Sequence, residues 1–153
     1  MRKFTAALLI LLPLTAAAHE FKSGDLLIDH PRIVETPPGA KVGAGYVTIV
    51  NSGGADDRLI AIESDLKVEM HASKVVEGVA SMKEMTDGFA IPAGETAGLG
   101  ADGTHAMFIG LKKQLKGGEA VDAVLVFEKA GRVAVTFNVE KRSAQTNEAH
   151  DHH

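Results

Sequence analysis

The side chains best suited to chemistry in this sequence are its histidines and methionines. Four of the five methionines lie between residues 70 and 107, with two histidines among them. His105 and Met107 are two residues apart, so on a strand both side chains project from one face. His71 and Met82 bracket the segment ASKVVEGVAS, whose EGV is typical of a hairpin turn that would bring its two ends side by side. These four side chains are therefore expected to meet at one rim of a β-structure.

Two imidazoles and two thioethers form a selective set of donors. Thioether sulfur is soft and suits Cu(I), imidazole accepts copper in either oxidation state, and neither donor suits Mg²⁺ or Ca²⁺. Zinc is disfavoured because thioethers are poor zinc ligands and no cysteine or carboxylate completes the set. Met85 lies three residues after Met82 and could replace it as a ligand. Met70 is expected to face the core, because it is adjacent to His71 and points to the other side of the strand.

The elements around these residues are predicted to be short strands. Runs with period-2 alternation or β-branched residues are separated by segments rich in Gly, Pro, Asn and Asp, and no helical stripe is sustained. Many short strands at this spacing predict an antiparallel sandwich or a small barrel. The expected strands are Leu26–Ile33, Gly45–Asn51, Arg58–Ser64, Val68–Ala72, Ala80–Met85, Thr96–Leu99, Ala106–Leu111, Ala120–Phe127 and Val133–Val139.

The first 18 residues are predicted to be a signal peptide. They combine the basic Arg2 and Lys3 with an apolar run and three alanines, so cleavage is expected after Ala18. The apolar run is too short to span a membrane, and the sequence has no cysteine to carry a lipid. Residues 19–140 are expected to form one exported domain, periplasmic and without membrane insertion.

Charge and composition exclude several classes of function. The chain has a formal net charge of −4, which becomes −6 without the two basic residues of the leader, so nucleic acid is not an expected partner. The absence of cysteine excludes thiolate nucleophiles, dithiol redox chemistry and blue-copper sites. No phosphate-binding loop or nucleophile elbow is present, and no catalytic residue is predicted.

Further histidines lie at the two ends of the predicted domain. After cleavage His19 would be the N-terminus, and its amine and imidazole would suit Cu(II). Residues 141–153 are predicted to be a flexible tail with three histidines, and these could also hold Cu(II), alone or with His19. His30 precedes a proline and is expected to be a hydrogen-bonding strand or turn residue. The three tail histidines are His150, His152 and His153.

The spacing of the four candidate ligands resembles that of the PCuAC copper chaperones. Their signature is a histidine, ten residues, a methionine, about twenty-one residues, and then His-x-Met. Here ten residues separate His71 from Met82, twenty-two separate Met82 from His105, and one separates His105 from Met107. The resemblance covers roughly residues 24–139, including IDHPRIVETPPGAKVGAGYVTIVNSG and IPAGETAGLGADGTHAMFIGLKKQLKGGE. Arg32 departs from the family, which often has an aromatic residue after His-Pro.

The resemblance implies an all-β fold, a cupredoxin-like Greek-key β-sandwich. It also implies a periplasmic copper chaperone that binds Cu(I) through the four side chains and delivers it to copper proteins of the cell envelope. Cytochrome c oxidase would be the usual recipient, with a thioredoxin-like assembly factor as co-worker. A monomer is expected. Two alternatives remain: a copper monooxygenase that uses His19, and a metal-free sandwich whose methionines only fill the core.

Overall fold

The protein is built from β-strands. The computed structural model describes residues 19–100 and 103–143, and within these ranges there is no helix. None of the described residues therefore forms a helix long and apolar enough to cross a membrane. The strands are β1 (Glu20–Ser23), β2 (Leu26–Val34), β3 (Val42–Asn51), β4 (Asp57–Glu63), β5 (Lys67–Val76), β6 (Val79–Glu84), β7 (Phe89–Ile91), β8 (Thr96–Leu99), β9 (Thr104–Ile109), β10 (Ala120–Phe127) and β11 (Gly131–Glu140).

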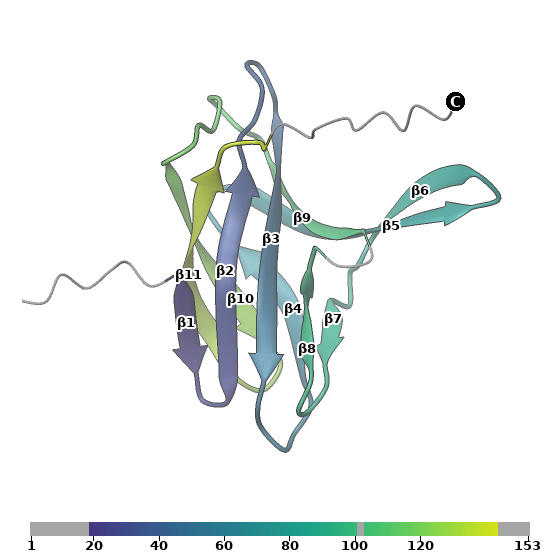
Figure 1. Ribbon diagram of the computed structural model, residues 1–153, viewed down its shortest axis with the longest axis vertical. Coiled ribbons are helices and arrows are strands. Elements are labelled where there is room, and N and C mark those ends of the chain that lie inside the picture. The colour runs from purple at the N-terminus through teal and green to yellow at the C-terminus, as the bar shows by residue number, and fades with distance from the viewer. Residues whose placement is uncertain (1–18, 101–102, 144–153) are drawn as a thin grey trace, which may run out of the picture.

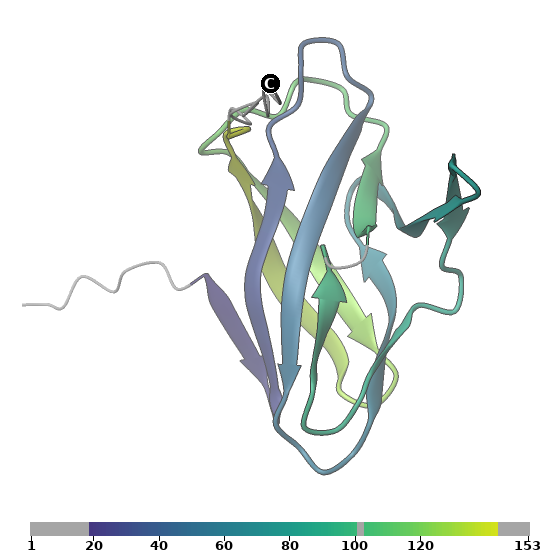
Figure 2. The ribbon, with the colours of Figure 1, turned by 45° about the vertical axis from the view of Figure 1, so that its right-hand side comes forward.

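These strands form one continuous sheet that folds over on itself (Figures 1 and 2). The order is β6-β5-β9-β3-β2-β11-β10-β4-β7, and β1 and β8 pair with β2 and β3 beside this path. All the pairings are antiparallel except that between β2 and β11, which joins the two layers. Strand β9, which carries two of the four candidate ligands, lies between β5 and β3 and is held on both sides.

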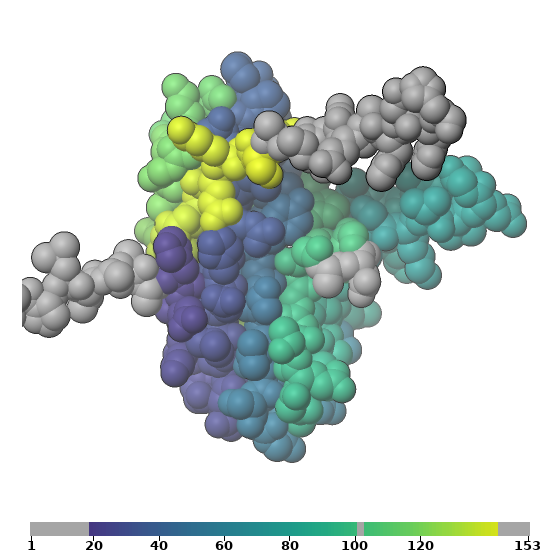
Figure 3. All heavy atoms as spheres, viewed as in Figure 1, coloured from purple at the N-terminus to yellow at the C-terminus, as the bar shows by residue number. Residues whose placement is uncertain are grey.

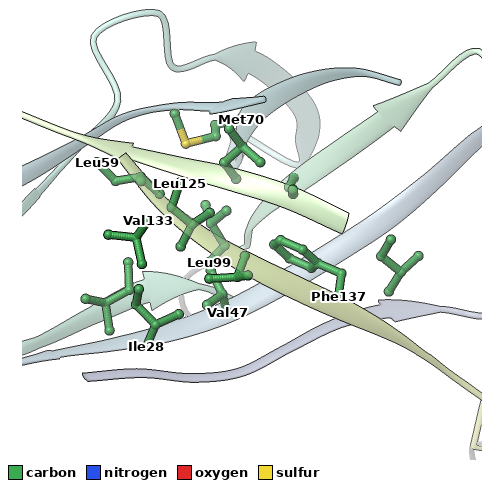
Figure 4. Close-up of a cluster of buried hydrophobic side chains, with 14 of the residues drawn as sticks. Ile28, Val47, Leu59, Met70, Leu99, Leu125, Val133 and Phe137 are labelled. Carbon is green, nitrogen blue, oxygen red and sulfur yellow. The ribbon is translucent and has the colours of Figure 1, made fainter. Parts of the chain in front are cut away.

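The core lies between the two layers and explains the period-2 pattern of the sequence (Figure 4). On β11, for example, Val133, Val135, Phe137 and Val139 are buried, while the residues between them are more exposed. Phe108 of β9 packs edge to face on Phe137, with 5.2 Å between the ring centroids. Position 45 of β3 must be glycine, because a Cβ there would lie 2.6 Å from the Phe108 ring.

The predicted all-β class and nine predicted strands are confirmed, with boundaries shifted by a few residues. The sequence analysis missed β1 and β7. The four residues of β1 form an edge strand with no fully buried side chain, and β7 has only three residues. The predicted signal peptide, residues 1–18, and the tail histidines His150, His152 and His153 lie outside the described residues.

The hairpin of β5 and β6 extends away from the sandwich (Figures 1 and 3). Strand β5 is longer than predicted, since it continues to Val76, whereas β6 keeps its predicted length and begins one residue earlier, at Val79. The turn consists of Glu77 and Gly78, both with positive φ, which is the geometry of a type I′ turn. The predicted hairpin is therefore confirmed, and it carries Met82 outward from the body of the molecule.

Candidate metal centre

Strand β9 presents His105 and Met107 on its outer side. The alternate residues Ala106 and Phe108 are fully buried, so they fix the orientation of the strand. Each candidate ligand is half-buried on the opposite side. The inward packing of Phe108 thereby determines which way the two candidate ligands point.

Strand β5 brings His71 against this pair. His71 is paired directly with His105 across the antiparallel ladder, so the two side chains share a face. Their rings stack with 6.1 Å between centroids and 25° between planes. On the same face, Glu69 is paired with Met107. The sheet therefore gathers two imidazoles and one thioether from two adjacent strands.

A carboxylate orients the His71 ring. The Nε2 of His71 lies 2.9 Å from Oε2 of Glu69, and both side chains are 17% exposed. When Nε2 donates this hydrogen bond, Nδ1 keeps its lone pair. That Nδ1 is buried and has no hydrogen-bond partner among the described residues. A buried nitrogen with a free lone pair, oriented through the other ring nitrogen, is the usual arrangement of a histidine that ligates a metal.

Lys67 keeps Glu69 in its charged form. The Lys67 ammonium pairs with Oε1 of Glu69. The pKa of Glu69 is lowered from its ordinary 4.5, first by the hydrogen bond from Lys67 and then by that from His71. The sequence analysis missed Glu69 and Lys67, although their spacing of two from one another and from His71 places all three on one face of a strand.

His105 has a hydrogen bond of its own. Its Nδ1 lies 3.3 Å from the carbonyl oxygen of Gly103. When Nδ1 donates to this carbonyl, Nε2 keeps the lone pair that a metal ligand needs. The two stacked rings therefore each have one nitrogen engaged with the protein and one nitrogen available.

Met82 lies on the same face, further out. It is paired with Ser73, two residues after His71 on β5, so it is the diagonal neighbour of His71. Its side chain is 56% exposed, much more than a core methionine would be. The β6 strand that carries it is the last strand at one end of the sheet. Met82 is thus next to His71 on the neighbouring strand, with β5 between it and the two donors of β9, and it remains open to solvent.

The other two methionines face the core. Met70 is 6% exposed and belongs to the core cluster, as predicted. Met85 follows the end of β6, packs against that cluster, and its backbone N–H donates to the carbonyl of Met70 at 2.7 Å. Its side chain is therefore directed inward, away from the face that carries His71.

Among the described residues, no group of three or more His, Cys, Asp and Glu side chains is arranged to hold a metal ion. A metal centre on this face would therefore need the methionine sulfurs as well as the imidazoles. Such a mixed set is suited to a soft ion and not to Mg²⁺, Ca²⁺ or Zn²⁺.

Two further histidines lie on the same outer face but beyond β3, at the start of the chain's described part and on β2. His19 and His30 have ring centroids 5.6 Å apart. His30 lies where the β2–β3 register shifts, and its Nε2 is 2.5 Å from Oε1 of Glu140. The prediction that His30 is a hydrogen-bonding strand residue agrees with this contact.

Comparison with known proteins links the chain to one family. A family model described as LpqE-like matches residues 26–139. The protein Lxx21020 of Leifsonia xyli subsp. xyli, whose name describes it as a lipoprotein, is 28% identical over 104 residues. The alignment covers 67% of this chain and 63% of Lxx21020, so the chain spans less than two thirds of that relative.

Two solved structures share the fold. The copper-bound PCuAC domain from PmoF2 is 28% identical with a TM-score of 0.66, over 81% of this chain and 99% of that domain. The solution structure of CuI-DR1885 from Deinococcus radiodurans is 28% identical with a TM-score of 0.59, over 84% of this chain and 85% of that protein. These matches confirm the predicted cupredoxin-like β-sandwich.

Proposed function

The chain belongs to the LpqE-like family, and from this membership and the chemistry of its outer face we propose that it is a copper chaperone. Its cargo is Cu(I), bound by His71, Met82, His105 and Met107. In support, two structures with the same fold are described as copper-bound, one of them as the CuI form. The observation that carries the proposal is the common face of β6, β5 and β9, on which all four donors lie.

Each side chain has a distinct part in this proposal. His71 binds through Nδ1, with Glu69 as its positioning residue, and His105 binds through Nε2. Met107 supplies a sulfur from the rigid β9 strand, and Met82 supplies a second from the hairpin. The inward packing of Met85 favours Met82 as the methionine of the second position.

The donor set suits transfer better than permanent storage. All four ligands are neutral, so they leave the charge of the copper ion uncompensated. Met82 is largely exposed and lies on an edge strand, where an incoming ligand from an acceptor protein can replace it. We propose that the chain works in the periplasm and supplies cytochrome c oxidase or a thioredoxin-like assembly factor, as its resemblance to the chaperones implies. No catalytic step is part of this proposal.

Anaerobic titration with Cu(I) against a competing chelator tests the site. We expect one Cu(I) to bind to the wild-type chain and the affinity to fall by at least about 100-fold in the His71→Ala, Met107→Ala double variant, since two of four ligands are lost. The matched control is His30→Asn, Met85→Leu, which removes one histidine and one methionine from other parts of the molecule. Equal Cu(I) affinity in the double variant and the wild type would refute the proposal.

A further inference from the structure

A hollow on the outer face of the sheet begins beside the proposed Cu(I) site. Its lining comes from β2, β3 and the end of β11, three strands that lie side by side (Figure 1), and it includes Ala44 of β3. Ala44 is paired with Met107 across the β3–β9 ladder, so the two side chains share one face and their Cα atoms are about 5 Å apart. The small side chain of Ala44 leaves a space of about 560 Å³ open next to a proposed copper ligand.

Three cations line this hollow, together with one carboxylate. Arg32 lies on β2, Lys141 and Arg142 directly follow β11, and Glu140 is the last residue of that strand. One oxygen of Glu140 is already engaged, since its Oε1 lies 2.5 Å from Nε2 of His30. The whole chain has a formal net charge of −4, so this positive charge is local and opposes the overall balance. The hollow is therefore expected to attract a negatively charged group.

Arg32 is held in a geometry that suits a carboxylate ligand. Its guanidinium lies over the ring of Tyr46, its partner across the β2–β3 ladder, with 5.0 Å between Cζ and the ring centroid. Stacking of this kind fixes the plane of the guanidinium and leaves its N–H donors at the edge. Within the described residues, the one carboxylate that pairs with Arg32 is that of Glu140, whose Oε2 lies 3.7 Å from Nε. That contact does not use the two terminal nitrogens, which can therefore bind a further carboxylate in bidentate fashion.

Lys141 and Arg142 add positive charge that the described part of the chain does not neutralise. Both side chains are exposed, and neither forms an ion pair with a carboxylate of residues 19–100 or 103–143. Exposed cations contribute little to folding stability, but they attract an oppositely charged partner from a distance and orient it. Because the hollow begins at Ala44, a partner attracted by these charges arrives beside Met107.

We propose that this hollow is the docking site for an acidic segment of the protein that accepts copper, with Arg32 binding one of its carboxylates. The inference rests on the proposed chaperone function, because the position beside Met107 is what connects the hollow with copper transfer. The order of the sheet places β9 and β5 between β3 and β6, the strand of Met82. Three strand spacings of about 4.8 Å lie well within the width of an ordinary protein interface. A partner docked in the hollow therefore extends across the copper ligands and can replace Met82 at the far end.

The test uses two synthetic peptides that share one copper-binding sequence of methionines and a histidine, one flanked by glutamates and the other by glutamines. Carboxylates are poor ligands for Cu(I), so the two peptides should hold Cu(I) equally well and differ in docking alone. NMR titration of the copper-free chain measures the docking. We expect the glutamate peptide to bind at least about tenfold more tightly at low salt, with the largest shifts at Arg32, Ala44 and Tyr46. The preference should vanish at about 1 M salt, where charges are screened within about 3 Å.

The double variant Arg32→Gln, Arg142→Gln should abolish the preference for the glutamate peptide and slow Cu(I) transfer to it, while Cu(I) affinity stays near the wild-type value. Lys141→Gln, Arg142→Gln changes two exposed residues beyond the last strand, so it should weaken the preference without disturbing the ladder. The matched control is Lys22→Gln, Lys129→Gln, which removes two charges from exposed positions on β1 and between β10 and β11. The control should keep the preference and the transfer rate.

Equal affinity of the wild-type chain for the two peptides, or an equal loss of preference in the control, would overturn the docking site. Tighter binding of inorganic phosphate than of the glutamate peptide would assign the hollow to a free anion and would overturn it as well. The NMR readout needs no copper. A chain that prefers the glutamate peptide but binds no Cu(I) would therefore refute the proposed Cu(I) site alone, and a chain that binds Cu(I) without this preference would refute the docking site alone.

Discussion

The two halves of β5 differ sharply in their surroundings. The first half is held between β9 and the core, with Met70 6% exposed. The second half pairs only with β6 and leaves the body of the protein, and Val75, Val76 and Val79 around its turn are 57–71% exposed. His71 lies where the first half gives way to the second.

This difference divides the proposed copper ligands into two groups. His71, His105 and Met107 are positioned by strands whose other face is packed in the core, so their geometry is fixed by the fold. Met82 is positioned by a two-stranded hairpin, an element that is only marginally stable on its own. The fold therefore combines three preorganised donors with one that can move without disturbing the core.

The largest effect is expected from the core beneath β9. Phe108→Ala should lower the free energy of unfolding by about 3–5 kcal/mol, because it removes a fully buried ring that packs on Phe137. Val79→Thr, at the exposed hairpin, should change it by less than about 0.5 kcal/mol. Denaturant unfolding measures both. Similar losses for the two variants would mean that the hairpin is as tightly integrated as the body.

Next in size is the contrast between the two neighbouring methionines. Met82→Leu should weaken Cu(I) binding at least about tenfold, equivalent to ~1.4 kcal/mol, with little change in stability. Met85→Leu should leave Cu(I) affinity near the wild-type value, since its side chain packs against the core. X-ray absorption of the Cu(I) form counts the sulfur neighbours. Loss of a sulfur in Met85→Leu, and not in Met82→Leu, would reverse the assignment.

The smallest effect concerns the pH dependence of the Lys67–Glu69 pair. Because the folded-state pKa of Glu69 is lowered from 4.5, chiefly by Lys67, its stabilising contribution is present above pH 4.5 and is lost as the pH falls through the lowered value. The stability difference between wild type and Glu69→Gln should therefore shrink between about pH 6 and about pH 3, a range that includes the ordinary carboxyl value.

Thermal unfolding across this range measures the difference. Glu77→Gln at the hairpin turn is the matched control, since it makes the same substitution at a carboxyl outside the pair with Lys67. A Glu69→Gln difference that stays constant with pH would show that the pair with Lys67 does not persist in solution.

Local patterns in the sequence predicted most of the sheet. Alternation identified β10 and β11, and Glu77-Gly78 between β-branched residues identified the hairpin. The same period-2 rule put His105 and Met107 on one face and turned Met70 to the core, and both are observed. These features depend on neighbours within a few residues, so the sequence contains them directly.

The remaining features depend on pairings between distant segments. The contact of His30 with Glu140 requires the parallel alignment of β2 and β11 and the register shift within β2. Neither has a local signature in the sequence. The choice between Met82 and Met85 likewise depends on how β6 leaves the core, which the spacing of the residues alone left open.

The chain between Met82 and His105 forms two strands in other parts of the sheet. These are β7, which pairs with β4, and β8, which pairs with β3. The chain then returns to β5 as β9, so that β5 pairs with both β6 and β9. The separation of Met82 from His105 in space is therefore set by the ladders on the two sides of β5, and not by the twenty-two residues between them. Insertions or deletions in the turns between β6 and β9 should therefore be tolerated in evolution without altering the ligand geometry. Relatives that differ in the number of residues between this methionine and this histidine can keep the same metal centre.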